Sequence, residues 1–160
     1  MNVPTVRMST TGRVRIALHL PRSRTDRGTY GRGMRITCVT IDCHDPFAVA
    51  RFWNAALRWG GVGGTEGGEG AVCGPPDSGM YLEFVRVPEP KEIKNRMHLG
   101  CGVASLEELE TEIDRLLDLG ATIAWEEEFP SDIAAEYRNL VLRDIEGNEF
   151  CVGAGSMPTS

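Results

Sequence analysis

Three side chains belong to residue types that bind soft metal ions: Cys38, His98 and Cys151. Two thiolates and an imidazole suit Zn²⁺ and would leave a fourth position open for water or a substrate. The spacing matches no recognised zinc pattern, and free cysteines are often simply buried side chains. The residue types therefore leave three hypotheses open: a metal site, ordinary lining of a cavity, and a redox-active pair of thiols.

His98 is also a candidate catalytic group or ligand contact, because the unperturbed pKa of histidine lies close to neutrality. Glu83 and Glu149 are candidate carboxylate bases that would act beside a bound metal. The alternative for His98 is a structural histidine whose hydrogen bonds are satisfied within the fold.

The densest basic cluster outside the N-terminal segment consists of Lys91, Lys94 and Arg96. An arginine fork suits a carboxylate or a phosphate, so the cluster predicts recognition of a small anion. The alternative is a solvated linker whose charges pair with neighbouring acids. Trp125, as a flat wall, and Asn139 complete the candidate ligand-binding set.

The elements that would position these residues occur twice, 60 residues apart. Residues 36–43 are followed by a helical pattern ending at Gly60, and residues 96–103 by one ending at Gly120. With this offset Cys38 falls on His98. A repeat of this size indicates two copies of one supersecondary unit that pack together.

Each copy contains an amphipathic helix with its own start signal. The first begins at the N-cap Asp45 with Pro46 at the first helical position. The second begins at Ser105, where Glu108 completes a capping box, and Gly120 ends it. The predicted buried faces are Val49, Ala50, Trp53, Ala56 and Leu57 in the first helix, and Leu106, Leu109, Ile113, Leu116 and Leu117 in the second.

Four strands are expected in each copy. They lie at 35–43, 61–65, 70–74 and 80–87, and at 96–103, 121–125, 137–143 and 149–153. Each copy is thus strand–helix–strand–strand–strand. The sequence predicts an α+β fold of two βαβββ modules, with a curved mixed sheet around a cup and the helices on the outer face.

Charge is unevenly distributed along the chain. Residues 1–33 carry seven arginines against a single acid, a net charge of +6, whereas the whole chain carries −6. The main body is therefore acidic and a poor binder of nucleic acid. The polar, glycine-rich composition of 21–33 predicts a disordered basic tail over 1–33.

We expect one domain at 34–154, with modules at about 34–88 and 96–154, and a short tail at 155–160.

No apolar run approaches the roughly 20 residues that span a bilayer, and the N-terminus lacks the apolar stretch of a signal peptide. The five cysteines are an odd number, which disfavours a complete disulfide framework. Together these features predict a cytoplasmic protein with free thiols and no membrane partner.

Five short stretches carry a resemblance to a known superfamily. They are IDCHDP at 41–46, ARFW at 50–53, FVRVP at 84–88, KEIKNRMH at 91–98 and DIEGNEFC at 144–151. The chain resembles the glyoxalase-like domains of the vicinal oxygen chelate superfamily, which includes glyoxalase I, extradiol dioxygenases and bleomycin-resistance proteins. The resemblance covers residue 34 to about residue 154.

The resemblance implies four positions that face a shared cup and bind a divalent metal in metal-using members. They fall on Cys38, Val85, His98 and Cys151, or on Glu83 instead of Val85 if the register shifts by two. Zn²⁺ or Ni²⁺ would be the metal. The resemblance also implies a homodimer.

The leading functional hypothesis is a glyoxalase-like protein that binds a small organic anion in the cup between its modules, with Arg96 and Lys94 holding the anion. One alternative is a metal-dependent lyase or isomerase. A second alternative is a structural or regulatory dimer without catalysis. The sequence leaves open whether the protein is an enzyme.

Overall fold

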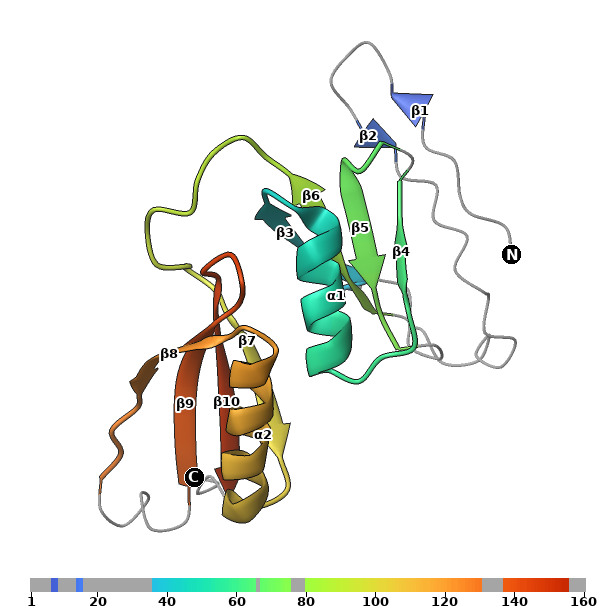
Figure 1. The fold of residues 1–160 in the computed structure, drawn as a ribbon. Coiled ribbons are helices and arrows are strands. Elements are labelled where there is room, and N and C mark those ends of the chain that lie inside the picture. The colour runs from blue at the N-terminus through green and yellow to red at the C-terminus, as the bar shows by residue number, and fades with distance from the viewer. Residues whose placement is uncertain are drawn as a thin grey trace, which may run out of the picture. The chain divides into compact units, whose positions relative to one another are not determined.

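A computed structural model describes residues 7–8, 14–15, 36–65, 67–75, 80–130 and 137–155 of the chain. The chain divides into two compact units, Met1–Pro90 and Lys91–Ser160 (Figure 1). The expected tails at 1–33 and 155–160 lie outside the described residues, apart from Gly155 and two short strands. These strands, β1 (Arg7–Met8) and β2 (Val14–Arg15), pair antiparallel.

The N-terminal unit contains the first βαβββ module. Its elements are β3 (Cys38–Cys43), α1 (Pro46–Ala56), β4 (Val62–Gly64), β5 (Gly70–Cys73) and β6 (Tyr81–Arg86). The strand order is β3-β6-β5-β4, with β3 parallel to β6 and the other pairs antiparallel. The first strand of the module therefore pairs with its last strand, as a βαβββ unit requires.

Helix α1 begins as its sequence predicts. The side chain of Asp45 accepts a hydrogen bond from the backbone N–H of Ala48 at 3.0 Å, and Pro46 occupies the first turn. Trp53 is 2% exposed and Val49 is fully buried, so the helix packs its apolar face against the sheet. The prediction that Trp53 belongs to the core is confirmed.

The C-terminal unit repeats this connectivity. Its elements are β7 (Leu99–Val103), α2 (Leu106–Asp118), β8 (Thr122–Glu126), β9 (Tyr137–Arg143) and β10 (Glu149–Gly155). The strand order is β7-β10-β9-β8, with β7 parallel to β10. The predicted α+β fold of two βαβββ modules is thus confirmed, each with a mixed four-stranded sheet and one helix.

Helix α2 has the predicted N-cap, and the return bond of Glu108 goes to the residue before the N-cap rather than to the N-cap itself. Ser105 Oγ accepts a hydrogen bond from the Glu108 N–H at 3.1 Å, and the Glu108 carboxylate accepts one from the Ala104 N–H at 3.0 Å. Gly120 ends the helical segment with φ of +103°, a conformation that glycine adopts without strain.

Three details differ from the sequence prediction. Leu117 was expected in the buried face of α2 but is 37% exposed, because it lies about 100° around the helix from Leu116, which is buried. The first strand was expected from residue 35, but β3 begins at Cys38, and Ile36 is 75% exposed. The last strand continues two residues beyond its predicted end at 153.

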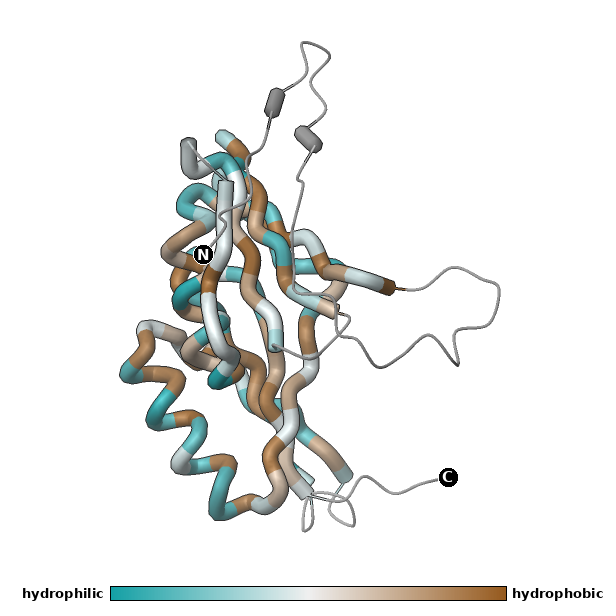
Figure 2. Tube along the Cα trace, turned by 90° about the vertical axis from the view of Figure 1, so that its right-hand side faces the viewer, coloured by the Kyte–Doolittle hydropathy of each residue, from teal (hydrophilic) through white to brown (hydrophobic). Residues whose placement is uncertain are grey.

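The amphipathic pattern is clearest in α2. Figure 2 shows apolar and charged positions alternating around the turns of α2, as expected for a helix with one buried stripe. Among the described residues, no helix is sufficiently long and apolar to cross a membrane.

Candidate functional site

Helix α2 covers one face of the C-terminal sheet, over β10 and β7 (Figure 1). Phe150 and Val152 of β10 are almost fully buried on this side. Arg138 of β9 belongs to the same side, because its guanidinium forms an ion pair with Glu110 of α2. These contacts fix which strand residues face the helix.

The alternate residues of β8, β9 and β10 face away from α2, because successive strand residues point to opposite sides of a sheet. We call this side the distal face. Its residues, aligned by the strand register, are Thr122, Trp125, Tyr137, Asn139, Val141, Arg143, Glu149, Cys151 and Gly153. Helix α2, the one helix among the described residues of this unit, lies on the opposite side.

Cys151 belongs to this distal face, and His98 lies just before β7, the strand that pairs with β10. Gly100 of β7 pairs with Cys151 in the β7–β10 register, and His98 lies one residue before the first residue of β7, Leu99. The His98 side chain is exposed, whereas Cys151 is half-buried. The structure therefore places an accessible imidazole one residue before β7.

Two side chains of β9 lie across β10 at Gly153. A methyl carbon placed on Gly153 would be 2.7 Å from the Tyr137 hydroxyl oxygen and 2.9 Å from Asn139 Oδ1. Both distances are far shorter than ordinary carbon–oxygen contacts, so the absence of a side chain at Gly153 is what admits these two oxygens.

The ring of Tyr137 is held by an edge-to-face contact with Phe129, with centroids 5.1 Å apart. Burial, and then the nearby Cys151 and Glu127, raise the pKa of Tyr137 above its usual value. The phenol is therefore protonated at neutral pH and can donate a hydrogen bond. The sequence prediction missed Tyr137, although its two-residue spacing from Asn139 on a strand was a visible signal.

Asn139 has a fixed orientation. Its side chain is 6% exposed, and its Nδ2 donates to Glu127 Oε2 at 2.8 Å. Because a carboxylate only accepts hydrogen bonds, the amide nitrogen must face Glu127, and Oδ1 must point the other way. Oδ1 is the atom that lies at Gly153.

Lys94 and Trp125, both predicted to contact a ligand, lie together. Lys94 Nζ is 4.6 Å from the centroid of the Trp125 ring, a cation–π contact. Trp125 is half-buried, and Lys94 and Arg96 are exposed. A positive charge and a flat aromatic surface therefore meet on the distal face.

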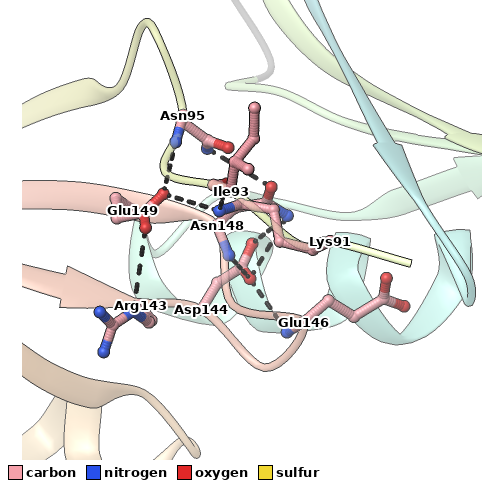
Figure 3. Close-up of polar contacts among 8 residues, drawn as sticks. All are labelled: Lys91, Ile93, Asn95, Arg143, Asp144, Glu146, Asn148 and Glu149. Atoms are coloured by element: carbon pink, nitrogen blue, oxygen red, sulfur yellow. Dashed lines mark hydrogen bonds and ion pairs between the residues drawn. The ribbon is translucent and has the colours of Figure 1, made fainter. Parts of the chain in front are cut away.

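Lys91 and Glu149 lie in a separate anchoring network, shown in Figure 3. Lys91 Nζ is 3.0 Å from Glu149 Oε2, and the same oxygen accepts the Asn95 N–H at 2.9 Å. Burial alone would raise the pKa of Glu149, but the bonds from Asn95 and Lys91 outweigh it and hold the pKa below its usual range. Glu149 therefore fixes the segment 91–95 to the start of β10.

The turn between β9 and β10 is part of this network. The Asp144 carboxylate accepts the backbone N–H groups of Glu146 at 3.0 Å and Asn148 at 2.9 Å. Asn148 in turn accepts a bond from the Asn95 side chain at 3.4 Å. The turn that the sequence predicted at 144–148 is thus held by a buried carboxylate (Figure 3).

The N-terminal unit places Cys38 and Glu83 on the face of its sheet that is turned away from α1. Thr40 donates to Glu83 Oε2 at 2.8 Å. Burial, then the charge and hydrogen bond of Cys38 and the charge of Glu83, raise the pKa of Tyr81 to about 12. Cys38, Thr40, Tyr81 and Glu83 therefore form one small polar cluster on β3 and β6.

The predicted metal ligands belong to different units, with Cys38 in the first and His98 and Cys151 in the second. Within either unit, the described residues contain no group of three or more His, Cys, Asp or Glu side chains that could hold a metal ion. The described residues of either unit alone therefore do not fit a divalent metal, and we derive no chemical step through one.

Two βαβββ modules, each with one helix on a mixed four-stranded sheet, define the class of protein to which this chain belongs. The family described as Glyoxalase-like domain matches residues 38–153. The chain is a member of this glyoxalase-like domain family, as the sequence resemblance implied. Comparison with curated proteins gives no match.

Solved structures share the fold at low sequence identity. The fosfomycin resistance protein FosX from Listeria monocytogenes, solved with Mn(II) and 1S,2S-dihydroxypropylphosphonic acid, has a TM-score of 0.61 and 16% identity, over 80% of this chain and 94% of FosX. A glyoxalase/bleomycin resistance protein/dioxygenase from Nocardioides has a TM-score of 0.60 and 17% identity, over 82% and 91%. At these identities the likeness shows the fold alone.

Proposed function

We propose that the distal face of the C-terminal sheet binds a small organic anion. The observation that carries this proposal is the position of Lys94 Nζ, 4.6 Å from the centroid of the Trp125 ring. An aromatic surface with an adjacent cation suits a flat organic group that bears a carboxylate or a phosphonate. Arg96, two residues along the chain from Lys94 and exposed, supplies a second positive charge.

Polar groups of the same face support this function. In this proposal His98, exposed one residue before β7, donates or accepts a hydrogen bond to the ligand. The side-chain amide of Asn139 is buried, and its hydrogen bond to Glu127 fixes its orientation. A few fixed polar groups beside an apolar wall are the usual composition of a small-molecule site. Binding needs no covalent step, so the protein acts by holding its ligand.

The test compares ligands of matched size and opposite charge. Thermal unfolding and calorimetric titration would be measured with phenylacetate and phenylphosphonate, and with 2-phenylethylamine as the cationic counterpart. We expect the two anions to raise the Tm and the amine to leave it unchanged, because a ligand that binds the folded state stabilises it. Mass spectrometry of the native protein would identify any compound that co-purifies.

The matched variants separate recognition from general charge effects. The double variant Lys94→Ala, Arg96→Ala should weaken anion binding about tenfold or more, the order expected for lost charge-assisted contacts. Arg51→Ala removes an exposed charge from α1 in the other unit and should leave binding unchanged. Equal binding by the double variant and the wild type would overturn the proposal.

The alternative of a metal-dependent lyase or isomerase draws on the predicted ligands Cys38, His98 and Cys151. FosX, solved with Mn(II), supports metal chemistry on this fold. For this chain, the FosX structure supports only a shared fold. If no anion bound and no metal were present, a structural or regulatory dimer would be the remaining hypothesis.

A further inference from the structure

Tyr137 and Asn139 present two different hydrogen-bonding groups at one point of the distal face. The Tyr137 hydroxyl and Asn139 Oδ1 are 2.7 Å and 2.9 Å from the position that a methyl carbon on Gly153 would occupy. The hydroxyl is a donor in its protonated form, and the amide oxygen is an acceptor. A donor and an acceptor thus lie side by side over the backbone of β10.

Both side chains are held in place by contacts to neighbouring residues, and these contacts are made by other atoms than the two oxygens. The ring of Phe129 meets the ring of Tyr137 edge to face, at an interplanar angle of 81°. Glu127 fixes the amide of Asn139 through Nδ2, so Oδ1 keeps its direction. Among the described residues, the hydrogen bond of the Asn139 side chain is the one that Nδ2 donates to Glu127, and it does not use Oδ1. The two side chains are therefore preorganised to form hydrogen bonds with a bound ligand.

We infer that Tyr137 and Asn139 form a donor–acceptor pair that selects ligands carrying a hydroxyl next to a carboxylate. In the bound state the Tyr137 hydroxyl donates to a carboxylate oxygen of the ligand. The neighbouring ligand hydroxyl donates to Asn139 Oδ1. This inference rests on the proposed function and narrows its ligand class from organic anions to 2-hydroxy acids.

Gly153 is the positioning residue of this pair. Any side chain there would occupy the space of both oxygens, because a Cβ cannot approach an oxygen as closely as 2.7 Å without displacing it. Gly61 offers a matched control, since an added methyl there meets no atom within 4 Å. Alanine at Gly153 should therefore remove selectivity, and alanine at Gly61 should not.

The experiment measures the Kd of phenylacetate and of each enantiomer of mandelate, its 2-hydroxy derivative, by calorimetric titration. We expect the wild type and Gly61→Ala to bind one mandelate enantiomer about tenfold or more tightly than phenylacetate, the order set by paired hydrogen bonds to a charged ligand. Tyr137→Phe, which keeps the ring and its Phe129 contact, and Gly153→Ala should reduce this ratio to near one.

The outcomes distinguish this inference from the proposed function. If the wild type binds phenylacetate and both mandelates equally, the donor–acceptor pair is overturned while anion binding stands. Retention of the full ratio in Tyr137→Phe would also overturn it, whether or not Gly153→Ala folds. If none of these anions binds, the proposed function fails and the inference fails with it.

Discussion

Lys91 and Glu149 form an ion pair of 3.0 Å between the segment that precedes β7 and the first residue of β10. The Glu149 side chain is only 5% exposed, so its charge is largely removed from water. A buried carboxylate is costly unless charged or N–H donors surround it, and here Lys91 and the Asn95 N–H supply them. The pair therefore fixes the start of the C-terminal unit to its own sheet.

We expect Glu149→Gln to destabilise the protein. The substitution keeps the size of the side chain but removes the charge that Lys91 and Asn95 stabilise, so the expected loss is about 1–3 kcal/mol. Urea unfolding would measure it. Glu92→Gln is the control, because Glu92 is exposed in the same segment and its substitution should change stability by less than about 0.5 kcal/mol. Equal effects of the two variants would contradict an anchoring role for Glu149.

The same carboxylate predicts a dependence of stability on pH. The pKa of Glu149 is lowered in the folded state, so its contribution is present in full above the unfolded pKa of about 4.3 and is lost as the pH falls through the folded pKa. The stability difference between wild type and Glu149→Gln should be constant from about pH 7 to 5 and should shrink below about pH 4. Urea unfolding at each pH would measure it. A difference that persisted to the lowest pH, or was already absent at neutrality, would be inconsistent with a lowered pKa.

The cysteines should divide into reactive and unreactive groups. Burial raises the pKa of the Cys73 thiol to about 12, and burial, then Cys151 and Glu112, raise that of Cys101 to about 11. Cys38, Cys101 and Cys151 are half-buried, whereas Cys43 and Cys73 are buried, so the raised pKa is what separates Cys101 from the other two half-buried thiols. Iodoacetamide at pH near 8, read by peptide mass spectrometry, should therefore modify Cys38 and Cys151 first.

Unfolding in urea before alkylation is the control for this prediction, since every thiol should then react alike. Early modification of Cys73 in the folded protein would contradict the burial of that side chain in β5. It would also weaken the assignment of the β5 register.

The parts of the fold that the sequence predicted well rest on local chemistry. Asp45 and Ser105 each accept a backbone N–H three residues further along, so a single short window contains the whole signal. The repeat is equally visible, because both modules place a helix and a stopping glycine at the same offset. Leu117 was misassigned because apolar spacing alone does not define the edge of a buried stripe.

The candidate site was harder to predict because its contacts join distant parts of the chain. Lys91 was expected to bind a ligand or to pair with neighbouring acids, but its partner is Glu149, which only the position of β10 brings close. Tyr137 was overlooked for a similar reason. Its hydroxyl matters because Gly153, on the adjacent strand, leaves room for it, and strand pairing is not encoded in either residue alone.

Removal of metal distinguishes the binding proposal from the lyase or isomerase hypothesis. Lys94, Arg96 and Trp125 are not metal ligands, so dialysis against a chelator should leave the Kd of phenylacetate unchanged. The metal content of protein purified without chelator would be measured in parallel by elemental analysis.

Stoichiometric zinc or nickel that is lost on chelation, together with loss of anion binding, would instead favour a metal held by Cys38, His98 and Cys151. In that case His98→Ala should abolish metal content while Glu92→Gln retains it, because only an imidazole or thiolate ligand contributes directly to such a site.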